Sequence, residues 1–523
     1  MRFAVGRHGP RLDSAWWRGG AALLAGALPA LAFPAPALWW FAYVALVPLL
    51  LLVRGAAGVR RAALDGWLGG TGFMLAVHHW LLPSLNVFIV VLAGLLGLLW
   101  APWGVLVRAT LGGRPSAVRA LVAVAVVPSG WLMVELVRSW QGLGGPWGLL
   151  GASQWQVTPA LRLMSVGGVW LVSLLVVAVN TAIALVVALP HVRTAMVSAL
   201  VVCALVTGAV WMWSPRPRPE GSLRVAVVQP GVVENADARF ARGEALTRAL
   251  AGQRVDLVVW GESSVGQDLA ARPDLAARLA RLSQVVGADI LVNVDARRSD
   301  QPGIFKSSVL VGPQGPTGLR YDKMRLVPFG EYIPARSLLG WATSVGKAAG
   351  EDRRRGTKTV VMTLPSKVRV GPLVCFESAF PDMSRHLVRD GAQLLIAQSS
   401  TSSFQGTWAP AQHASLAALR AAETGRPMVH ATLTGISAVY DADGGRVGHW
   451  LGTSASASQV YDIPLATGTT PYVRFGAWAV YCALAVLAVF CAAEGARTLR
   501  RPAQGTPARS ARTAHESPAR PGR

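Results

Sequence analysis

Apolar stretches of membrane-spanning length fill the first 214 residues of the chain and return once near its end. A helix needs roughly 20 apolar residues to cross a bilayer. Stretches near this length lie at about 19–34, 36–53, 64–82, 86–107, 117–138, 165–189, 193–214 and 473–495. The pattern predicts a polytopic α-helical membrane domain of about eight transmembrane helices, seven in residues 1–214 and the eighth in residues 471–497.

The polar stretch between these segments, residues 215–470, has a different pattern. Short β-like runs alternate with helical stretches, which predicts an α/β domain. The expected strands lie at 223–228, 255–260, 290–294, 308–311, 368–375, 394–398 and 428–432, and helical stretches at 236–251 and 410–423. Pro215, Pro217 and Pro219 predict a stiff linker at the start of this domain, and the Pro-, Ala-, Arg- and Ser-rich residues 498–523 predict a disordered basic tail.

Arginines between the apolar segments predict the orientation of the membrane domain. They occur in alternate connections between the predicted spans: at Arg54, Arg60 and Arg61, at Arg108, Arg114 and Arg119, at Arg193 and in the tail. The positive-inside rule then places both termini in the cytoplasm. Seven crossings put residues 215–470 on the outer face of the cell membrane. The first segment is not followed by a small-residue cleavage signature, so we expect it to be a retained helix.

Composition agrees with a multi-pass membrane protein. The chain of 523 residues is 52% hydrophobic and 15% charged, whereas soluble domains are about 25% charged. Its formal charge of +23 comes almost wholly from arginine, because lysine occurs only at positions 306, 323, 347, 358 and 367. The residues 215–470 carry no basic face or known nucleic-acid-binding motif, so we expect no nucleic-acid partner.

The cysteines favour neither a disulfide framework nor a zinc site, both of which need partners at defined spacings. Cys203, Cys482 and Cys491 fall inside long apolar runs, where they are expected to act as small hydrophobic residues. Cys375 alone belongs to the polar domain. No pattern indicates a metal or a cofactor.

Three stretches of the polar domain offer candidates for chemistry. Cys375 follows an apolar run; such a cysteine is more often structural, and reactivity requires a base or a positive charge nearby. Glu262 lies in VVWGES just after an apolar run, where a cleft carboxylate and a solvated loop acid are equally compatible with the pattern. Lys323 and Glu331 lie in YDKMRLVPFGEYIP, and scarce lysine in an arginine-rich chain favours a need for a compact ammonium group.

Taken together, these stretches resemble the nitrilase superfamily and, within it, the membrane-embedded apolipoprotein N-acyltransferase family; LVPFGEY is the most specific motif. The resemblance implies an extracytoplasmic nitrilase-like αββα sandwich with Glu262, Lys323 and Cys375 as catalytic residues. Glu331 and Glu377 would support them.

The resemblance extends to the membrane domain and the end of the polar domain. Glu135 and Arg138, and Trp147 within GGPWGLLGASQ, look like the family's pattern at the outer membrane face, where they are candidates for substrate or membrane contact. Gln412, His413, Arg420, Glu423 and Arg426 would support the floor of the active site. The chain departs from the family pattern at Gly261, Lys306 and Phe376, where proline, asparagine and tyrosine are frequent, and in SSTSSFQG, residues 399–406.

The activity implied by the resemblance is acyl transfer from a membrane phospholipid, through a cysteine thioester, to the N-terminal α-amino group of diacylglyceryl-cysteine of apolipoproteins. This is the last step of lipoprotein maturation. Two alternatives remain open: a membrane-anchored amidase or nitrilase-type hydrolase, in which water resolves the thioester, and an inactive paralogue that acts as a scaffold. Lipid dependence would separate the transferase from the hydrolase.

Overall fold

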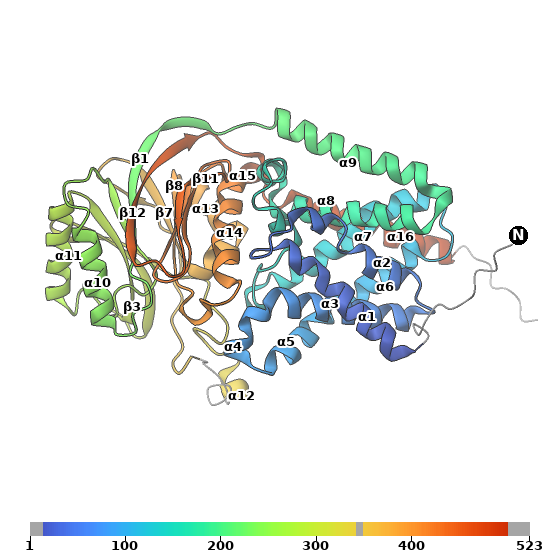
Figure 1. Ribbon diagram of the computed structural model, residues 1–523, viewed down its shortest axis with the longest axis horizontal. Coiled ribbons are helices and arrows are strands. Elements are labelled where there is room, and N and C mark those ends of the chain that lie inside the picture. Colours follow the sequence, from blue (N-terminus) through green and yellow to red (C-terminus); the bar gives the residue numbers. More distant parts are fainter. Residues whose placement is uncertain (1–13, 341–348, 500–523) are drawn as a thin grey trace, which may run out of the picture.

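The computed structural model describes residues 14–340 and 349–499. Within them, a helical bundle and a two-sheet sandwich lie side by side, and helix α14 stands between the two (Figure 1). The predicted tail lies outside the described residues from position 500 onward, as does the amino-terminal segment 1–13.

The helical bundle contains the apolar segments. Its longer helices are α1 Ala15–Ala27, α2 Val47–Arg54, α3 Val59–His78, α5 Phe88–Gly97, α6 Trp100–Leu111, α7 Ala117–Arg138, α8 Thr158–Ala188, α9 Arg193–Trp213 and α16 Trp478–Leu499, with short α4 Leu82–Leu85 and α15 Pro471–Phe475. Ser116 begins α7 by accepting a hydrogen bond from the backbone of Arg119. Helix α8 is broken at Gly168, whose φ of 71° is left-handed.

Four described helices are long and apolar enough to cross a membrane: Ala117–Arg138, Thr158–Ala188, Pro190–Trp213 and Trp478–Leu499. A fifth span results if α5 and α6, which meet at a bend of 42°, count as one. The predicted number of eight therefore stays a prediction. Helix α3 has the length of a span, but it contains Asp65, whose buried carboxylate pairs with Arg18 and Arg61 at 2.9 and 2.7 Å.

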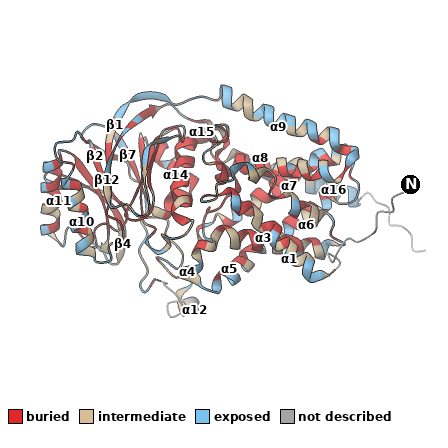
Figure 2. Cartoon of the chain, in the orientation of Figure 1, coloured by how far each residue is buried: buried red, intermediate tan, exposed pale blue. Residues whose placement is uncertain are grey.

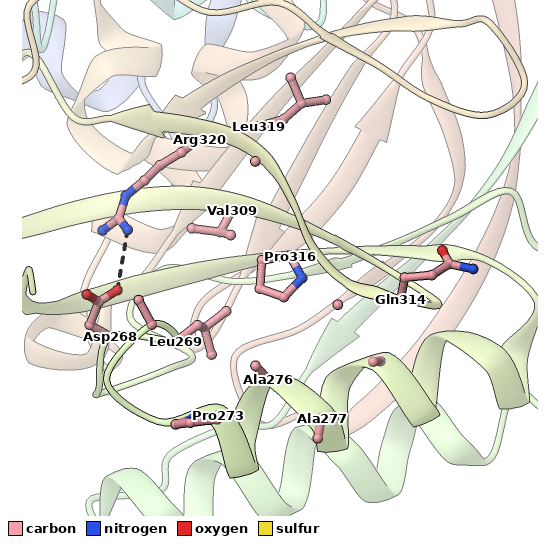
Figure 3. Close-up of a pocket in the computed structure, with 14 residues that line it drawn as sticks. Asp268, Leu269, Pro273, Ala276, Ala277, Val309, Gln314, Pro316, Leu319 and Arg320 are labelled. Carbon is pink, nitrogen blue, oxygen red and sulfur yellow. Dashed lines mark hydrogen bonds and ion pairs between the residues drawn. The ribbon is translucent and has the colours of Figure 1, made fainter. Parts of the chain in front are cut away.

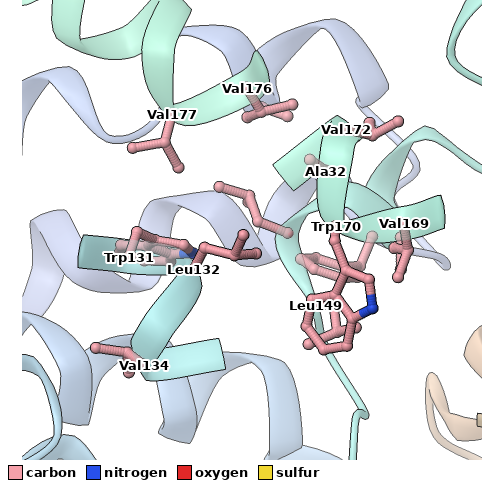
Figure 4. Close-up of a cluster of buried hydrophobic side chains, with 14 of the residues drawn as sticks. Ala32, Trp131, Leu132, Val134, Leu149, Val169, Trp170, Val172, Val176 and Val177 are labelled. Atoms are coloured by element: carbon pink, nitrogen blue, oxygen red, sulfur yellow. The ribbon is translucent and has the colours of Figure 1, made fainter. Parts of the chain in front are cut away.

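The bundle buries large aromatic and branched side chains between its helices. Trp131 and Leu132 of α7 lie near Trp170, Val176 and Val177 of α8 in the same cluster (Figure 4). The outer surface is apolar as well. In α9 only Met196 is buried, and the rest of that helix is largely exposed (Figure 2). Apolar side chains on the outside of a helix are typical of a lipid-facing surface.

The sandwich consists of two six-stranded sheets. The first has the order β12-β1-β2-β3-β4-β5, formed by β1 Arg218–Gln229, β2 Leu257–Trp260, β3 Asp289–Arg297, β4 Ile304–Gly312, β5 Gly315–Asp322 and β12 Ala457–Thr467. The second has the order β11-β10-β9-β8-β7-β6, formed by β6 Met362–Thr363, β7 Arg369–Val374, β8 Leu394–Ser399, β9 Met428–Thr432, β10 Ser437–Tyr440 and β11 Arg446–Leu451. The central strands β1, β2 and β3 are parallel, as are β7, β8 and β9.

Helices cover both outer faces of the sandwich, as expected for buried parallel strands. Helices α10 Ala236–Arg248 and α11 Pro273–Val286 cover the first sheet, whereas α13 Pro381–Arg389 and α14 Ala409–Thr424 cover the second (Figure 1). Short α12 Arg336–Leu339 lies in a loop. Apolar side chains of both sheets, such as Val259 and Ile396, form the core between them. The four layers confirm the predicted αββα sandwich.

Several predicted boundaries differ from the structure, and two of the differences concern the start of the sandwich and the site. The predicted linker 215–219 overlaps β1, which begins at Arg218. Arg218 already pairs with Thr467 of β12. The predicted strand 368–375 ends at Val374, because Cys375 begins a 3-10 turn, η8 Cys375–Ala379.

Candidate active site

Cys375 lies at a sharp turn between β7 and η8. Its φ of 53° is left-handed, which is rare for a residue with a side chain and costs free energy. Two hydrogen bonds hold the turn: the backbone N–H of Val374 donates to Glu377 Oε2 at 2.8 Å, and Ser378 Oγ donates to the Cys375 carbonyl at 2.9 Å. Cys375 is thus held in place, half-buried, directly after a buried strand.

Glu262 follows β2 on the facing sheet, and its buried carboxylate is close enough to Cys375 to raise the pKa of the thiol. Cys375 Sγ donates a hydrogen bond to the carbonyl of Ser400, with 3.9 Å between sulfur and oxygen. Its backbone N–H donates to the carbonyl of Ser399 across the sandwich at 3.1 Å. The preceding Gly261 fits this close approach, because a Cβ there would lie 1.9 Å from the backbone nitrogen of Leu433. The glycine that departs from the family pattern is thus required by the packing of the two sheets.

Lys323 comes directly after β5 and is completely buried. Its Nζ lies 2.7 Å from Glu331 Oε1 and 3.4 Å from Glu262 Oε1. A second lysine, Lys306 of β4, places its Nζ 2.8 Å from the same oxygen of Glu262. Two ammonium groups and two carboxylates therefore surround the region beside the thiol.

These charges shift the pKa values of the site. Burial would raise the pKa of Glu262, but the ammonium groups of Lys306 and Lys323 outweigh burial and lower it to about 2. Burial would lower the pKa of both lysines, yet their carboxylate neighbours raise it. Burial and then the Glu262 carboxylate raise the pKa of Cys375 to about 12. The resting site pairs a neutral thiol with an ionised carboxylate, which is the arrangement needed for general-base activation of a thiol.

Glu331 and Glu377 support the loop that carries Lys323. Glu331 Oε2 accepts the backbone N–H of Val327 at 2.8 Å. Glu377 is fully buried, and its Oε1 accepts from Tyr321 Oη, which belongs to β5, at 2.7 Å. Since Glu377 Oε2 binds the turn that carries Cys375, this one carboxylate connects the nucleophile turn with the lysine loop.

Glu135, Arg138 and Trp147 are not in this cluster. Glu135 Oε1 accepts from the backbone of Leu150 at 2.7 Å, and Arg138 Nη1 donates to the carbonyl of Trp147 at 2.5 Å. Both side chains are buried at the end of α7 and brace the loop 144–150. Trp147 Nε1 in turn donates to Gln412 Oε1 of α14 at 2.8 Å, which joins this loop to the sandwich.

Lys306 is a site residue that was not predicted, although the scarcity of lysine in the chain was a usable signal. His413 was expected to support the floor of the active site; its Nε2 lies 3.1 Å from the Cys375 carbonyl.

A cavity of about 520 Å³ elsewhere, between α11 and the β4–β5 hairpin, contains none of the candidate residues. Figure 3 shows Asp268 facing Arg320 at one end of that cavity.

Comparison with known families defines the class of protein first. Residues 224–469 match the carbon-nitrogen hydrolase family, in agreement with the αββα sandwich. Residues 25–182 match the apolipoprotein N-acyltransferase N-terminal domain. The sandwich is thus of the carbon-nitrogen hydrolase class, joined to a helical domain found in apolipoprotein N-acyltransferases.

Relatives over nearly the whole length specify the family. The apolipoprotein N-acyltransferase of Geobacter metallireducens is 30% identical over 500 residues, covering 89% of this chain and 94% of the relative. That of Azotobacter vinelandii is 31% identical over 499 residues, covering 89% and 93%. The chain belongs to the apolipoprotein N-acyltransferase family. A carbon-nitrogen hydrolase superfamily structure from Xanthomonas campestris is 20% identical with a TM-score of 0.36, covering 46% of this chain and 91% of that one.

Proposed function

We propose that the chain transfers an acyl group from a membrane phospholipid, through a thioester on Cys375, to the N-terminal α-amino group of the diacylglyceryl-cysteine of an apolipoprotein. The observation that carries the proposal is that the half-buried Cys375 lies beside the buried Glu262 and Lys323 in a member of the apolipoprotein N-acyltransferase family. A nucleophile, a base and a fixed cation are the parts that acyl transfer through a thioester needs.

In the first half-reaction, Glu262 takes the proton of Cys375 Sγ, and the thiolate attacks the carbonyl carbon of the phospholipid ester. The negative charge that develops on the carbonyl oxygen is stabilised by the ammonium group of Lys323, which is buried away from water. The C–O bond of the ester then breaks. Glu262 returns its proton to the departing oxygen, and lysophospholipid leaves.

The second half-reaction reverses the roles of nucleophile and leaving group. The neutral α-amino group attacks the thioester carbonyl, and Glu262 accepts a proton from the nitrogen as the C–N bond forms. The C–S bond breaks and Cys375 recovers its proton from Glu262. The product is an amide, so the acyl chain ends on the lipoprotein and the enzyme returns to its starting state.

Placement relative to the membrane is part of the proposal. Residues 1–214 would form seven spans and residues 471–497 an eighth, with both termini cytoplasmic and the catalytic domain, residues 215–470, on the outer face. The exposed apolar surface of α9 supports contact with lipid, and α14 of the sandwich packs directly on α8 of the bundle. Acyl donors and lipid-bearing acceptors could then reach Cys375 while their chains stay in the bilayer.

Mass spectrometry of the purified protein after incubation with a phospholipid, first intact and then as a digest, tests this function. The wild type is expected to gain the mass of one acyl chain on the peptide that contains Cys375, and a diacylglyceryl lipopeptide should discharge it. Cys375→Ala should remain unmodified, whereas Cys482→Ala, which removes an exposed cysteine of α16, should behave as the wild type. An adduct that water clears as fast as the lipopeptide does would indicate a hydrolase, and no adduct in any lipid would indicate an inactive scaffold.

A further inference from the structure

Lys306 occupies a position in the site that the mechanism above leaves unused. It projects from β4, directly opposite Asp295 of the neighbouring strand β3. Its Nζ lies 2.8 Å from Glu262 Oε1, 3.3 Å from Glu331 Oε1 and 3.6 Å from Asp295 Oδ2. One ammonium group thus contacts three carboxylates, all from different elements of the chain.

The two lysines share the same pair of anions. Each of them contacts Oε1 of Glu262 and Oε1 of Glu331, so that positive and negative groups alternate around a closed ring. The lysines differ in their further partners. Lys306 has Asp295 in addition, whereas the ion pairs of Lys323 are with Glu262 and Glu331 alone within the described residues.

We propose that Lys306 is a positioning residue for acyl transfer: it holds Glu262 aligned and ionised, and thereby leaves the ammonium group of Lys323 free to face the oxyanion. The inference rests on the proposed function. When Glu262 takes the thiol proton, it becomes neutral and its ion pairs are lost. Lys306 then still has Glu331 and Asp295 as partners, whereas Lys323 gains an unused donor at the moment when the carbonyl oxygen becomes negative.

Without Lys306, Lys323 would be the only ammonium group for both Glu262 and Glu331. A single cation shared by two buried carboxylates would stay tied to them, because an unpaired buried charge is costly. Glu262 would also be held from one side only. The second lysine therefore separates two tasks, orientation of the base and stabilisation of the oxyanion.

Removal of Lys306 should change the pH dependence of the reaction in a defined direction. Burial raises the pKa of Glu262, and the two ammonium groups lower it. With one of them gone, the pKa rises, and the carboxylate is protonated and lost as a base at a higher pH than in the wild type. The charged and titratable groups around Glu262 and its partners are Lys306, Lys323, Cys375, Glu331, Asp295, Arg353 and His413.

The test compares Lys306→Met, Lys306→Arg and the matched control Lys358→Met, which changes an exposed lysine outside the site. Single-turnover acylation of Cys375 by a phosphatidylglycerol is followed by intact-protein mass spectrometry between pH 3.0 and 8.5. The wild-type acid limb follows the Glu262 pKa of about 2, so the wild-type rate should be nearly flat over this range. In Lys306→Met the limb should move up by about one pH unit or more, so that at pH 3.0 the variant falls to about half or less of its own rate at pH 7.5. Lys306→Arg should keep the limb of the wild type because it keeps the charge, and Lys358→Met should be unchanged.

A pH profile of wild-type shape in Lys306→Met would overturn the inference, whether or not the rate falls uniformly. Absence of any Cys375 adduct in the wild type at every pH would instead overturn the proposed function. Thermal unfolding checks that each variant is folded. If Lys306→Met does not fold, Lys306→Gln provides the same comparison, since it keeps a hydrogen-bond donor toward Glu262 and removes only the charge.

Discussion

Replacement of Glu377 by glutamine tests how the site is held together. The fully buried carboxylate accepts hydrogen bonds from Tyr321 Oη and the backbone N–H groups of Met324 and Arg325 on Oε1, at 2.7, 2.7 and 3.0 Å. Its Oε2 accepts the N–H of Val374 at 2.8 Å. Glutamine has almost the same shape but only one acceptor oxygen. Placed with that oxygen toward the three donors, it turns its own NH₂ group toward the Val374 N–H.

The cost of this change can be worked out from the contacts. One buried backbone N–H loses its acceptor, which costs about 1–3 kcal/mol, and three bonds to a charged oxygen become bonds to a neutral one. We therefore expect Glu377→Gln to be destabilised by about 2–4 kcal/mol. The clash falls on the residue directly before Cys375, and a misplacement of about 1 Å can cost 10²-fold in rate. Acylation of Cys375 should accordingly slow by about 10²-fold.

Two measurements check this expectation: thermal unfolding in detergent, and the single-turnover rate of acyl-adduct formation with phospholipid. The control is Glu351→Gln, which removes an exposed carboxylate paired with Arg297 at 2.6 Å. Pairs of that kind contribute about 0–1 kcal/mol, so the control should match the wild type in both assays. A Glu377→Gln protein that acylates at the wild-type rate would refute the view that this carboxylate aligns the nucleophile turn.

Glu262→Gln and Glu423→Gln give two further predictions, one for reactivity and one for stability. Glu262→Gln should abolish acyl transfer but speed alkylation of Cys375 by iodoacetamide at pH 8–9. The carboxylate helps to raise the thiol pKa to about 12, so its loss increases the thiolate fraction. Alkylation that slows together with acyl transfer would contradict this. Glu423→Gln can keep the hydrogen bond from the Val169 N–H but leaves the buried Arg420 without its anion, which should destabilise the protein by about 3–5 kcal/mol. An unchanged unfolding midpoint would show that the charge of Glu423 is dispensable.

The strands that the sequence predicts well are those with continuous apolar runs. Strands β2, β3, β8 and β9 are buried largely on both faces, so each is a continuous apolar run that can be recognised without knowing its neighbours in the sheet. Strands β5, β6, β10, β11 and β12 were not predicted. Strand β6 has only two residues, and in β11 every residue is at least partly exposed, so these strands are defined mainly by pairing with their neighbours.

The site shows the same division between local and long-range information. Glu262 and Cys375 could be found because each follows a recognisable strand, and Lys323 because lysine is scarce in the chain and this one lies beside the LVPFGEY motif. The structure brings the three together across the two sheets. The role of Lys306 depends on the register of β4 against β3, which places it beside Asp295. That register belongs to a hairpin of consecutive strands and is local. The contact of Lys306 with Glu262 joins residues 44 positions apart and depends on the pairing of β2 with β3 as well, so it could not be read from the residues near Lys306.

The pairing of β1 with β12 has a consequence for the ancestry of the chain. Arg218, at the start of the sandwich, is the cross-strand partner of Thr467, near its end, and neighbouring strands lie only about 4.8 Å apart. In topological terms the sandwich is an insertion into the connection between helices α9 and α15, and its two ends lie next to each other. Domains with adjacent ends can be added at a single loop without rearranging the host. A single insertion at one loop would therefore suffice to unite the sandwich with the helical bundle.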